Sequence, residues 1–149
     1  MEVSESLVRV FVVEDHPVMR TMLCETIERH PQCRLLGTAA SAEEALEALS
    51  TLEVDLALID VSLPRMSGID LVRCLKERPP EVRCLMVSGH VEPSYAMQAL
   101  DAGACGYVLK GNPADLDAAI AACNRGEVYL SPPLEHRVER LEETREHEG

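Results

Sequence analysis

Short apolar runs alternate with amphipathic segments along most of this chain. The clearest run is Leu56–Ile59, four apolar residues that lead directly into Asp60 and are followed by the turn residues Pro64 and Gly68. A short apolar run bounded by turn residues is typical of a strand that is buried on both faces. Four other segments have the same character, so the expected strands are Val8–Val13, Leu35–Leu36, Leu56–Asp60, Val82–Val87 and Cys105–Leu109.

Helical periodicity fills the intervals between these strands. The apolar stripe that is expected for the first helix consists of Val18, Met22, Leu23 and Ile27. Signals for helix starts stand at Pro17, at Ser41 with Glu44, at Ser67, at Pro93 and at Asn112-Pro113. Because strands and helices alternate through short loops, we predict an α/β fold with a five-stranded parallel sheet, doubly wound, of the flavodoxin-like kind.

Composition narrows the class of protein. A chain of 149 residues with 46% hydrophobic residues suits one domain with an aliphatic core, since it has no Trp and one Phe. No apolar run approaches the roughly 18 residues of a membrane-spanning helix, and the acidic start Met1–Glu5 lacks the basic residues of a signal peptide. The six cysteines show no metal-ligand spacing. We therefore expect a cytoplasmic protein with reduced thiols and no membrane contact.

The ends of the chain differ from its centre. We expect an N-terminal extension over residues 1–6, a domain over residues 7–132 and a charged tail over residues 133–149. In the tail, Leu134, Val138 and Leu141 have helical spacing, while Glu and Arg dominate the other positions. A solvated, fraying helix is the favoured interpretation, and a short coiled-coil stub for dimerisation is the alternative.

Polar residues follow four of the expected strands. Glu14 and Asp15 come after the first strand, Asp60 ends the third, Ser88 follows the fourth and Lys110 follows the fifth. In a parallel sheet these carboxyl ends lie at one edge, where ligands and chemistry gather. Taken alone, Asp60 is also explained as a carboxylate in a loop that ends a strand. The five residues together predict a site.

The residue types at this edge suit phosphoryl chemistry. Three neighbouring carboxylates repel one another unless a cation intervenes, and oxygen ligands without His or Cys suit Mg²⁺. Lys110 supplies a compact positive charge for a phosphate, and Ser88 supplies a hydroxyl that donates or accepts a hydrogen bond. An aspartate such as Asp60 in these surroundings is equipped to attack phosphorus and carry an acyl phosphate.

From roughly Leu7 to Pro132 the chain resembles the receiver domain of two-component response regulators. The residues that carry the resemblance are the acidic pair Glu14 and Asp15, the phosphoacceptor position Asp60, the hydroxyl position Ser88, the aromatic switch position Tyr107 and the lysine position Lys110. The segments Val13–Pro17, Pro64–Gly68 and Gly103–Lys110 are similar to the NarL/LuxR-type subclass, although that subclass often has Asp in place of Glu14.

The resemblance implies a mechanism and a set of partners. Asp60 would take a phosphoryl group from a histidine kinase or a histidine phosphotransfer protein. Asp15, Asp60 and the backbone carbonyl of Ser62 would hold Mg²⁺, with Glu14 acting through water. Lys110 and Ser88 would bind the phosphoryl oxygens, and Tyr107 would turn inward to switch a protein-interaction face. A downstream protein or a second copy of the chain would then bind this face.

Several alternatives stay open from the sequence. A phosphatase or mutase with an aspartate nucleophile would need a second acid two residues later, where Ser62 stands. A flavin or nucleotide module would need a Gly- or Ser/Thr-rich loop after the first strand, where Glu14 and Asp15 would repel a phosphate. Tyr107 is also explained as a half-buried strand residue without a switching role.

Three further questions concern histidines, nucleic acid and the output domain. His16 is expected to mark a helix start, and His90 to influence the access of water to an acyl phosphate.

The net charge of −12 argues against DNA binding by this chain. Relatives of the subclass usually carry a helix-turn-helix domain after the receiver, so the chain is either a stand-alone receiver or part of a longer regulator. The protein is not expected to be a turnover enzyme acting on a separate substrate.

Overall fold

Strands and helices alternate through the whole structure, a computed structural model that describes residues 7–148. The expected N-terminal extension over residues 1–6 lies outside this range. The elements are β1 (Val8–Val13), α1 (Pro17–Arg29), β2 (Cys33–Ala39), α2 (Ala42–Leu49), β3 (Leu56–Asp60), α3 (Gly68–Lys76), β4 (Arg83–Ser88), α4 (Pro93–Ala102), β5 (Gly106–Leu109), α5 (Pro113–Asn124), β6 (Tyr129–Leu130) and α6 (Pro132–Glu148).

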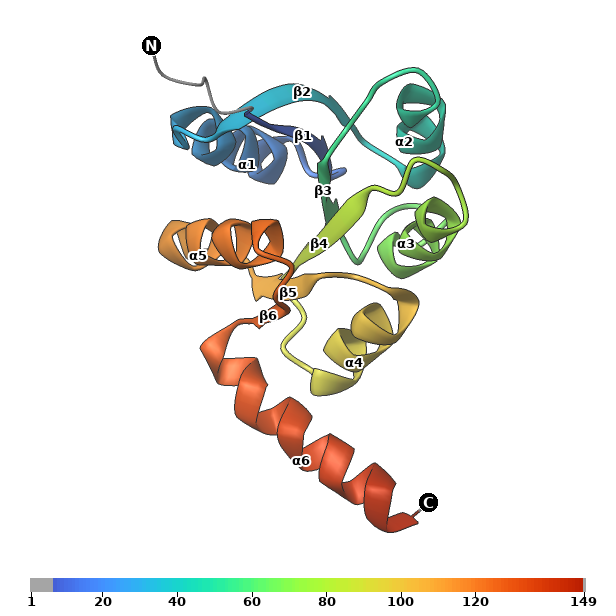
Figure 1. The fold of residues 1–149 in the computed structure, drawn as a ribbon, viewed down its shortest axis with the longest axis vertical. Helices are drawn as coiled ribbons and strands as arrows, with labels where there is room; N and C mark the ends of the chain where they lie inside the picture. Colours follow the sequence, from blue (N-terminus) through green and yellow to red (C-terminus); the bar gives the residue numbers. More distant parts are fainter. Residues whose placement is uncertain (1–6, 149) are drawn as a thin grey trace.

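The strands form one parallel sheet in the order β2-β1-β3-β4-β5-β6. Helices α1 and α5 cover one face, and α2, α3 and α4 cover the other, so the predicted doubly wound α/β fold is confirmed (Figure 1). The predicted number of strands is wrong, because β6 adds a sixth strand beside β5. This strand has only two residues, which is too short for its sequence to show a periodicity.

The sheet separates two apolar clusters, and β3 contributes to both. Ala57 and Ile59 lie in the cluster under α2, α3 and α4, whereas Leu56 and Leu58 lie in the cluster under α1 and α5. All four side chains are 0% exposed. The unbroken apolar run of β3 is therefore explained by burial on both faces. Asp60 directly continues this rigid central strand, which fixes its position at the edge of the sheet.

Three of the predicted helix caps are present. The backbone N–H of Glu44 donates to Ser41 Oγ at 3.1 Å, that of Asp70 to Ser67 Oγ at 3.1 Å, and that of Asp115 to Asn112 Oδ1 at 3.2 Å. Each cap satisfies a backbone donor that the first turn of a helix leaves unpaired. These caps end the loops that follow β2, β3 and β5, and the last two of these loops carry residues of the candidate site.

The C-terminal segment forms the helix α6, which packs beside α4 (Figure 1). Leu134 is 0% exposed and Val138 is 3% exposed, and Leu141 is partly buried against the same cluster. The expectation of a solvated helix is wrong for these turns, because α4 offers an apolar surface that the tail sequence alone does not reveal. The boundary between domain and tail at residue 132 stays a prediction. Within residues 7–148 no helix has the length and apolarity needed to cross a membrane.

Candidate functional site

The carboxyl ends of β1, β3, β4 and β5 bring the predicted residues to one edge of the sheet. Lys110 Nζ lies 2.9 Å from Glu14 Oε1 and 3.3 Å from Asp60 Oδ2. Glu14 is 0% exposed and Asp60 is 2% exposed. Lys110 therefore links the carboxylates that follow two different strands, and the predicted convergence of these three residues is present.

Burial and the close carboxylates perturb the acid–base properties of this edge. Burial, together with the negative charge of Glu14, raises the pKa of Asp60 to about 6. Burial also acts to raise the pKa of Glu14, but the ammonium of Lys110 and hydrogen bonds from His16 outweigh it and hold that pKa below its usual range. For Lys110, burial acts to lower the pKa, but the neighbouring carboxylates of Glu14 and Asp60 outweigh burial and raise it. Lys110 thus stays cationic between two acids.

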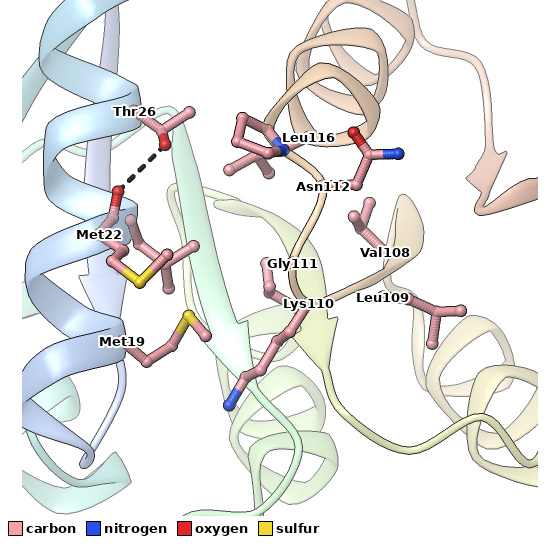
Figure 2. Close-up of a pocket in the computed structure, with 12 residues that line it drawn as sticks. Met19, Met22, Thr26, Val108, Leu109, Lys110, Gly111, Asn112 and Leu116 are labelled. Atoms are coloured by element: carbon pink, nitrogen blue, oxygen red, sulfur yellow. Dashed lines mark hydrogen bonds between the residues drawn. The ribbon is translucent and has the colours of Figure 1, made fainter.

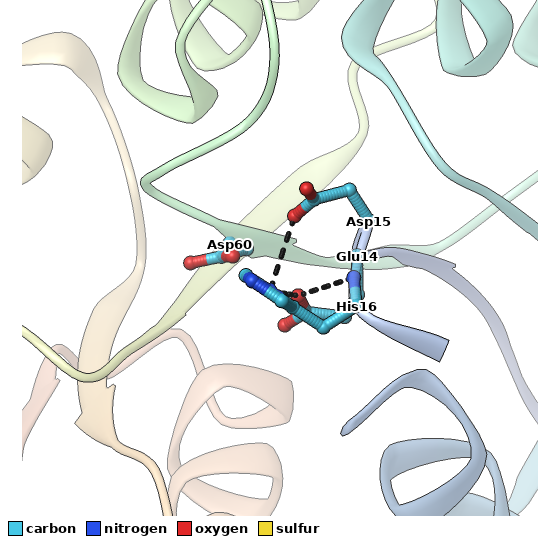
Figure 3. A group of neighbouring side chains, drawn as sticks. All are labelled: Glu14, Asp15, His16 and Asp60. Atoms are coloured by element: carbon cyan, nitrogen blue, oxygen red, sulfur yellow. Dashed lines mark hydrogen bonds and ion pairs between the residues drawn. The ribbon is translucent and has the colours of Figure 1, made fainter. Parts of the chain in front are cut away.

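His16 joins the acidic group from the start of α1. Its Nδ1 lies 3.1 Å from Glu14 Oε2 and 3.3 Å from Asp15 Oδ1, as Figure 3 shows. The residue is the N-cap of α1, as the sequence predicted, but its contact with both acids was not predicted. The neighbouring Pro17 indicates a helix start, and nothing in the local sequence indicates that the His16 ring turns back toward the acids.

The donor set fits a divalent cation. One ligand atom each from Glu14, Asp15, His16 and Asp60 lie within 4.8 Å of one another. Three buried oxygens accept no hydrogen bond from the described residues, namely Glu14 Oε1, Asp15 Oδ1 and Asp60 Oδ2. Lys110 and His16 approach them at ion-pair distance without well-directed hydrogen bonds. Buried carboxylate oxygens of this kind are the ligands that hard cations prefer.

Ser62 and His90 border the Asp60 carboxylate. The backbone N–H of Ser62 donates to Asp60 Oδ1 at 3.2 Å, and its hydroxyl lies 2.7 Å from His90 Nε2. Gly68 lies so close to the backbone of Asp60 that a Cβ at position 68 would be 2.0 Å from the Asp60 carbonyl oxygen. Asp60 is therefore held from its backbone and from one carboxylate oxygen, while Oδ2 keeps no hydrogen bond.

Ser88, His90 and Tyr107 form a second group beside Asp60. Ser88 is 0% exposed, and its Oγ accepts a hydrogen bond from the His90 backbone N–H at 3.0 Å. Tyr107 is also 0% exposed, its hydroxyl donates to the His90 carbonyl at 3.1 Å, and burial raises its pKa to about 12. Tyr107 is therefore fully buried, and not half-buried as the alternative interpretation had it. Its role as a switch residue stays a prediction.

Comparison with known proteins identifies the family. The sequence model of the "Response regulator receiver domain" matches residues 10–121. The chain belongs to the response regulator receiver family. A solved relative, a LuxR-family two-component response regulator from Aurantimonas sp., has 31% identity and a TM-score of 0.86, with 92% of this chain and 99% of that chain covered.

Two curated relatives of this receiver are longer regulators. DNA-binding transcriptional activator DevR/DosR of Mycobacterium tuberculosis is 38% identical over 104 residues, which are 70% of this chain and 48% of the relative. Nitrate/nitrite response regulator protein NarL of Escherichia coli is 34% identical over 128 residues, which are 84% of this chain and 58% of the relative. The chain thus spans about half to three fifths of the length of these relatives.

An apolar cleft lies between α1 and α5 of the receiver, beside Lys110 (Figure 2). Met19, Met22 and Leu116 line it, and the lining continues to Lys110. Of the four residues predicted for the apolar stripe of α1, Leu23 and Ile27 are buried, as expected. Val18 is 75% exposed and Met22 is 48% exposed, so the prediction is wrong for these two.

Proposed function

We propose that this receiver accepts a phosphoryl group on Asp60 from a phosphohistidine and thereby acts in a two-component phosphorelay. One observation carries the proposal: Asp60 is buried at a strand end, with Lys110 3.3 Å from its Oδ2 and two further acids beside it. Glu14 pairs with the same lysine at 2.9 Å. The phosphoryl donor is a sensor histidine kinase or a histidine phosphotransfer protein.

The reacting atom of Asp60 is Oδ2. Oδ1 accepts a hydrogen bond from the Ser62 backbone, whereas Oδ2 accepts none from the described residues. Oδ2 attacks phosphorus in line, a P–O bond forms, the P–N bond to the donor histidine breaks, and the imidazole nitrogen takes the electron pair. Lys110 lies close enough to Oδ2 to exchange its ion pair with this oxygen for one with a phosphoryl oxygen. Ser88 donates its hydroxyl to another phosphoryl oxygen.

Magnesium is the proposed cofactor. Asp15, Asp60 and the Ser62 backbone carbonyl would hold the ion, and Glu14 would act through water. Mg²⁺ bound there would supply positive charge against the negative charge that develops on the transferred phosphoryl group. The support for this set is the pair of buried carboxylate oxygens without hydrogen bonds at Glu14 and Asp15, which lie beside the Asp60 carboxylate. His16 would yield its contacts with Glu14 and Asp15 to the ion.

The receiver transmits its state through protein contacts. Ser88 and Tyr107 both contact the backbone of His90, so movement of the Ser88 hydroxyl toward a phosphoryl group reaches Tyr107 through that residue. The recipient is a downstream protein or a second receiver. We also propose the NarL/LuxR-type subclass, a cytoplasmic location, and a role as a phosphoacceptor without turnover of a separate substrate.

The phosphoryl donor docks on α1 and the neighbouring cleft. Val18 and Met22 are exposed apolar side chains on successive turns near the site, and a donor must approach this edge to reach Asp60. Val18→Glu should slow phosphotransfer from a histidine donor protein and leave phosphorylation by acetyl phosphate unchanged. Equal slowing of both reactions would contradict docking at Val18.

The net charge of −12 opposes direct binding of this chain to DNA. Fluorescence anisotropy with random duplex DNA at low salt should show no binding in the micromolar range, with or without phosphorylation. Salt-sensitive binding in that range would contradict this part of the proposal.

Intact-mass spectrometry tests the phosphoacceptor. Acetyl phosphate with Mg²⁺ should add one phosphoryl group to the wild type, and chelation of the metal should prevent the addition. Asp60→Asn should stay unmodified, whereas Asp117→Asn, which removes an exposed aspartate of α5, should react like the wild type. Equal labelling of Asp60→Asn and the wild type would refute the assignment.

A further inference from the structure

Helix α6 is attached to the strand that leads to Lys110. Ser131, the residue before α6, donates its backbone N–H to the Tyr107 carbonyl at 3.1 Å. Its hydroxyl accepts the backbone N–H of Leu109 at 2.8 Å and donates to the buried carboxylate of Asp115. The start of α6 is thus hydrogen-bonded to β5 and α5, one residue away from the site lysine.

Beyond this attachment, α6 covers α4 and the loop before it. Leu134 and Val138 are buried in the cluster that contains Tyr107. Arg137 Nη1 makes a long contact of 3.5 Å with the Val91 carbonyl. The adjacent carbonyl, that of His90, accepts the Tyr107 hydroxyl at 3.1 Å. Two consecutive carbonyls of the loop over residues 89–92 are therefore held by groups from α6 and β5.

Through His90, the same loop contacts two residues of the phosphoacceptor site, Ser88 and Ser62. The His90 backbone N–H donates to Ser88 Oγ at 3.0 Å, and the His90 ring lies 2.7 Å from the Ser62 hydroxyl. Restricting the loop therefore restricts Ser88 and His90. A site whose groups are already ordered binds its ligand at a lower entropic cost.

We propose that α6 is a positioning element for the Asp60 site, so that its docking on α4 and the binding of a phosphoryl group at Asp60 strengthen each other. The coupling rests on the proposed function. Undocking α6 removes Leu134 and Val138 from the cluster that contains Tyr107 and breaks the Arg137 contact. The loop then gains freedom, and Ser88 is no longer held in place. Because coupling between two sites is reciprocal, a bound phosphoryl group must in turn favour docked α6.

Beryllofluoride, a phosphoryl mimic, tests the coupling in the full chain. Its affinity in the presence of Mg²⁺ is measured by ¹⁹F NMR, the affinity for Mg²⁺ alone by calorimetry, and docking of α6 by hydrogen exchange of residues 134–141. Val138→Asp places a charge in the buried contact and should undock the helix. His136→Asp adds the same charge at an exposed position of α6 and is the matched control.

The expected result is a split between the two affinities. Val138→Asp should speed exchange in α6 and weaken beryllofluoride binding about 5- to 20-fold, while Mg²⁺ affinity stays within twofold, because the acidic ligands do not lie on the loop. His136→Asp should match the wild type. In the wild type, beryllofluoride should slow exchange in α6.

Three milder variants keep the proposal testable where Val138→Asp does not fold. Arg137→Gln should weaken beryllofluoride binding, Arg137→Lys should restore part of the loss, and Arg140→Gln on the exposed side should have no effect. Unchanged beryllofluoride affinity with a demonstrably undocked α6 would overturn the coupling. A parallel fall in Mg²⁺ affinity would also overturn it, since that indicates general destabilisation. A wild type that binds Mg²⁺ but no beryllofluoride would instead refute the proposed function.

Discussion

Replacing Asp60, the proposed phosphoacceptor, should stabilise the metal-free protein. Asp60 is 2% exposed, and burial together with Glu14 raises its pKa from an ordinary 3.8 to about 6. The folded state therefore disfavours the charged carboxylate. At about 1.4 kcal/mol per pH unit, this change in pKa corresponds to about 3 kcal/mol of lost stability once Asp60 is ionised. Asp60→Asn removes the charge and keeps the shape of the side chain.

The stability that Asp60→Asn gains over the wild type should increase with pH. A group whose pKa is raised by folding destabilises the fold progressively as pH rises from its unfolded value of 3.8 through its folded value of about 6. Below pH 4 both forms of the protein carry a neutral group at position 60, so the difference in stability should vanish. Above pH 7 Asp60→Asn should be more stable by about 1 to 3 kcal/mol, with the lower figure reflecting relaxation around the charge.

Urea unfolding in the presence of a chelator, followed by circular dichroism from pH 4 to pH 8, measures this difference. In thermal scans each kcal/mol should raise Tm by about 2 to 4 °C. Asp117→Asn controls for the general loss of one negative charge from an acidic chain. Millimolar Mg²⁺ should stabilise the wild type and leave Asp60→Asn unchanged. If Asp60→Asn is no more stable than Asp117→Asn at pH 8, the electrostatic account of the site is wrong.

Three further predictions address the metal, the hydroxyl and the mouth of the site. Asp15→Ala should weaken Mg²⁺ binding in calorimetry more than Glu14→Ala, because a direct ligand contributes more than one that acts through water; the reverse order would place Glu14 on the ion. Ser88→Ala should still accept a phosphoryl group, but NMR shifts around Tyr107 on phosphorylation should shrink; a wild-type response would contradict the link. His90→Ala should shorten the lifetime of the phosphorylated protein, because the ring that contacts Ser62 no longer limits the access of water to Asp60. Mass spectrometry measures this lifetime, and an unchanged value would exclude the role.

The fold and the convergence of the site were predictable because both follow from periodicity. The apolar run of β3 and the alternation of strands with helices fix a parallel sheet. A parallel sheet in turn places Asp60 and Lys110 at one edge, although fifty residues separate them. The ion-pair distances between Lys110 and the two acids confirm this inference.

The features that the sequence did not predict depend on contacts between distant elements. Leu134 and Val138 are buried only because α4 lies beside them, and Val18 is exposed because α1 turns its other face to the sheet. The orientation of the His16 ring toward the acids is likewise set by three-dimensional packing. A helical spacing of apolar residues indicates a face, but it does not indicate which element covers that face.

Charge balance supports the proposal that a divalent cation and Lys110 act together at this site. With Glu14, Asp15 and Asp60 ionised, three carboxylates face the single ammonium of Lys110, so the site carries two excess negative charges, which a divalent cation matches. Lys110 lies between Glu14 and Asp60, at 2.9 Å and 3.3 Å. A cation held by the acids would take over part of its role and free the ammonium for an incoming phosphoryl oxygen. Lys110→Met should therefore weaken beryllofluoride binding and leave Mg²⁺ affinity the same or higher. Lys110→Arg should not restore wild-type beryllofluoride binding, because the planar guanidinium does not replace a compact charge between two buried acids.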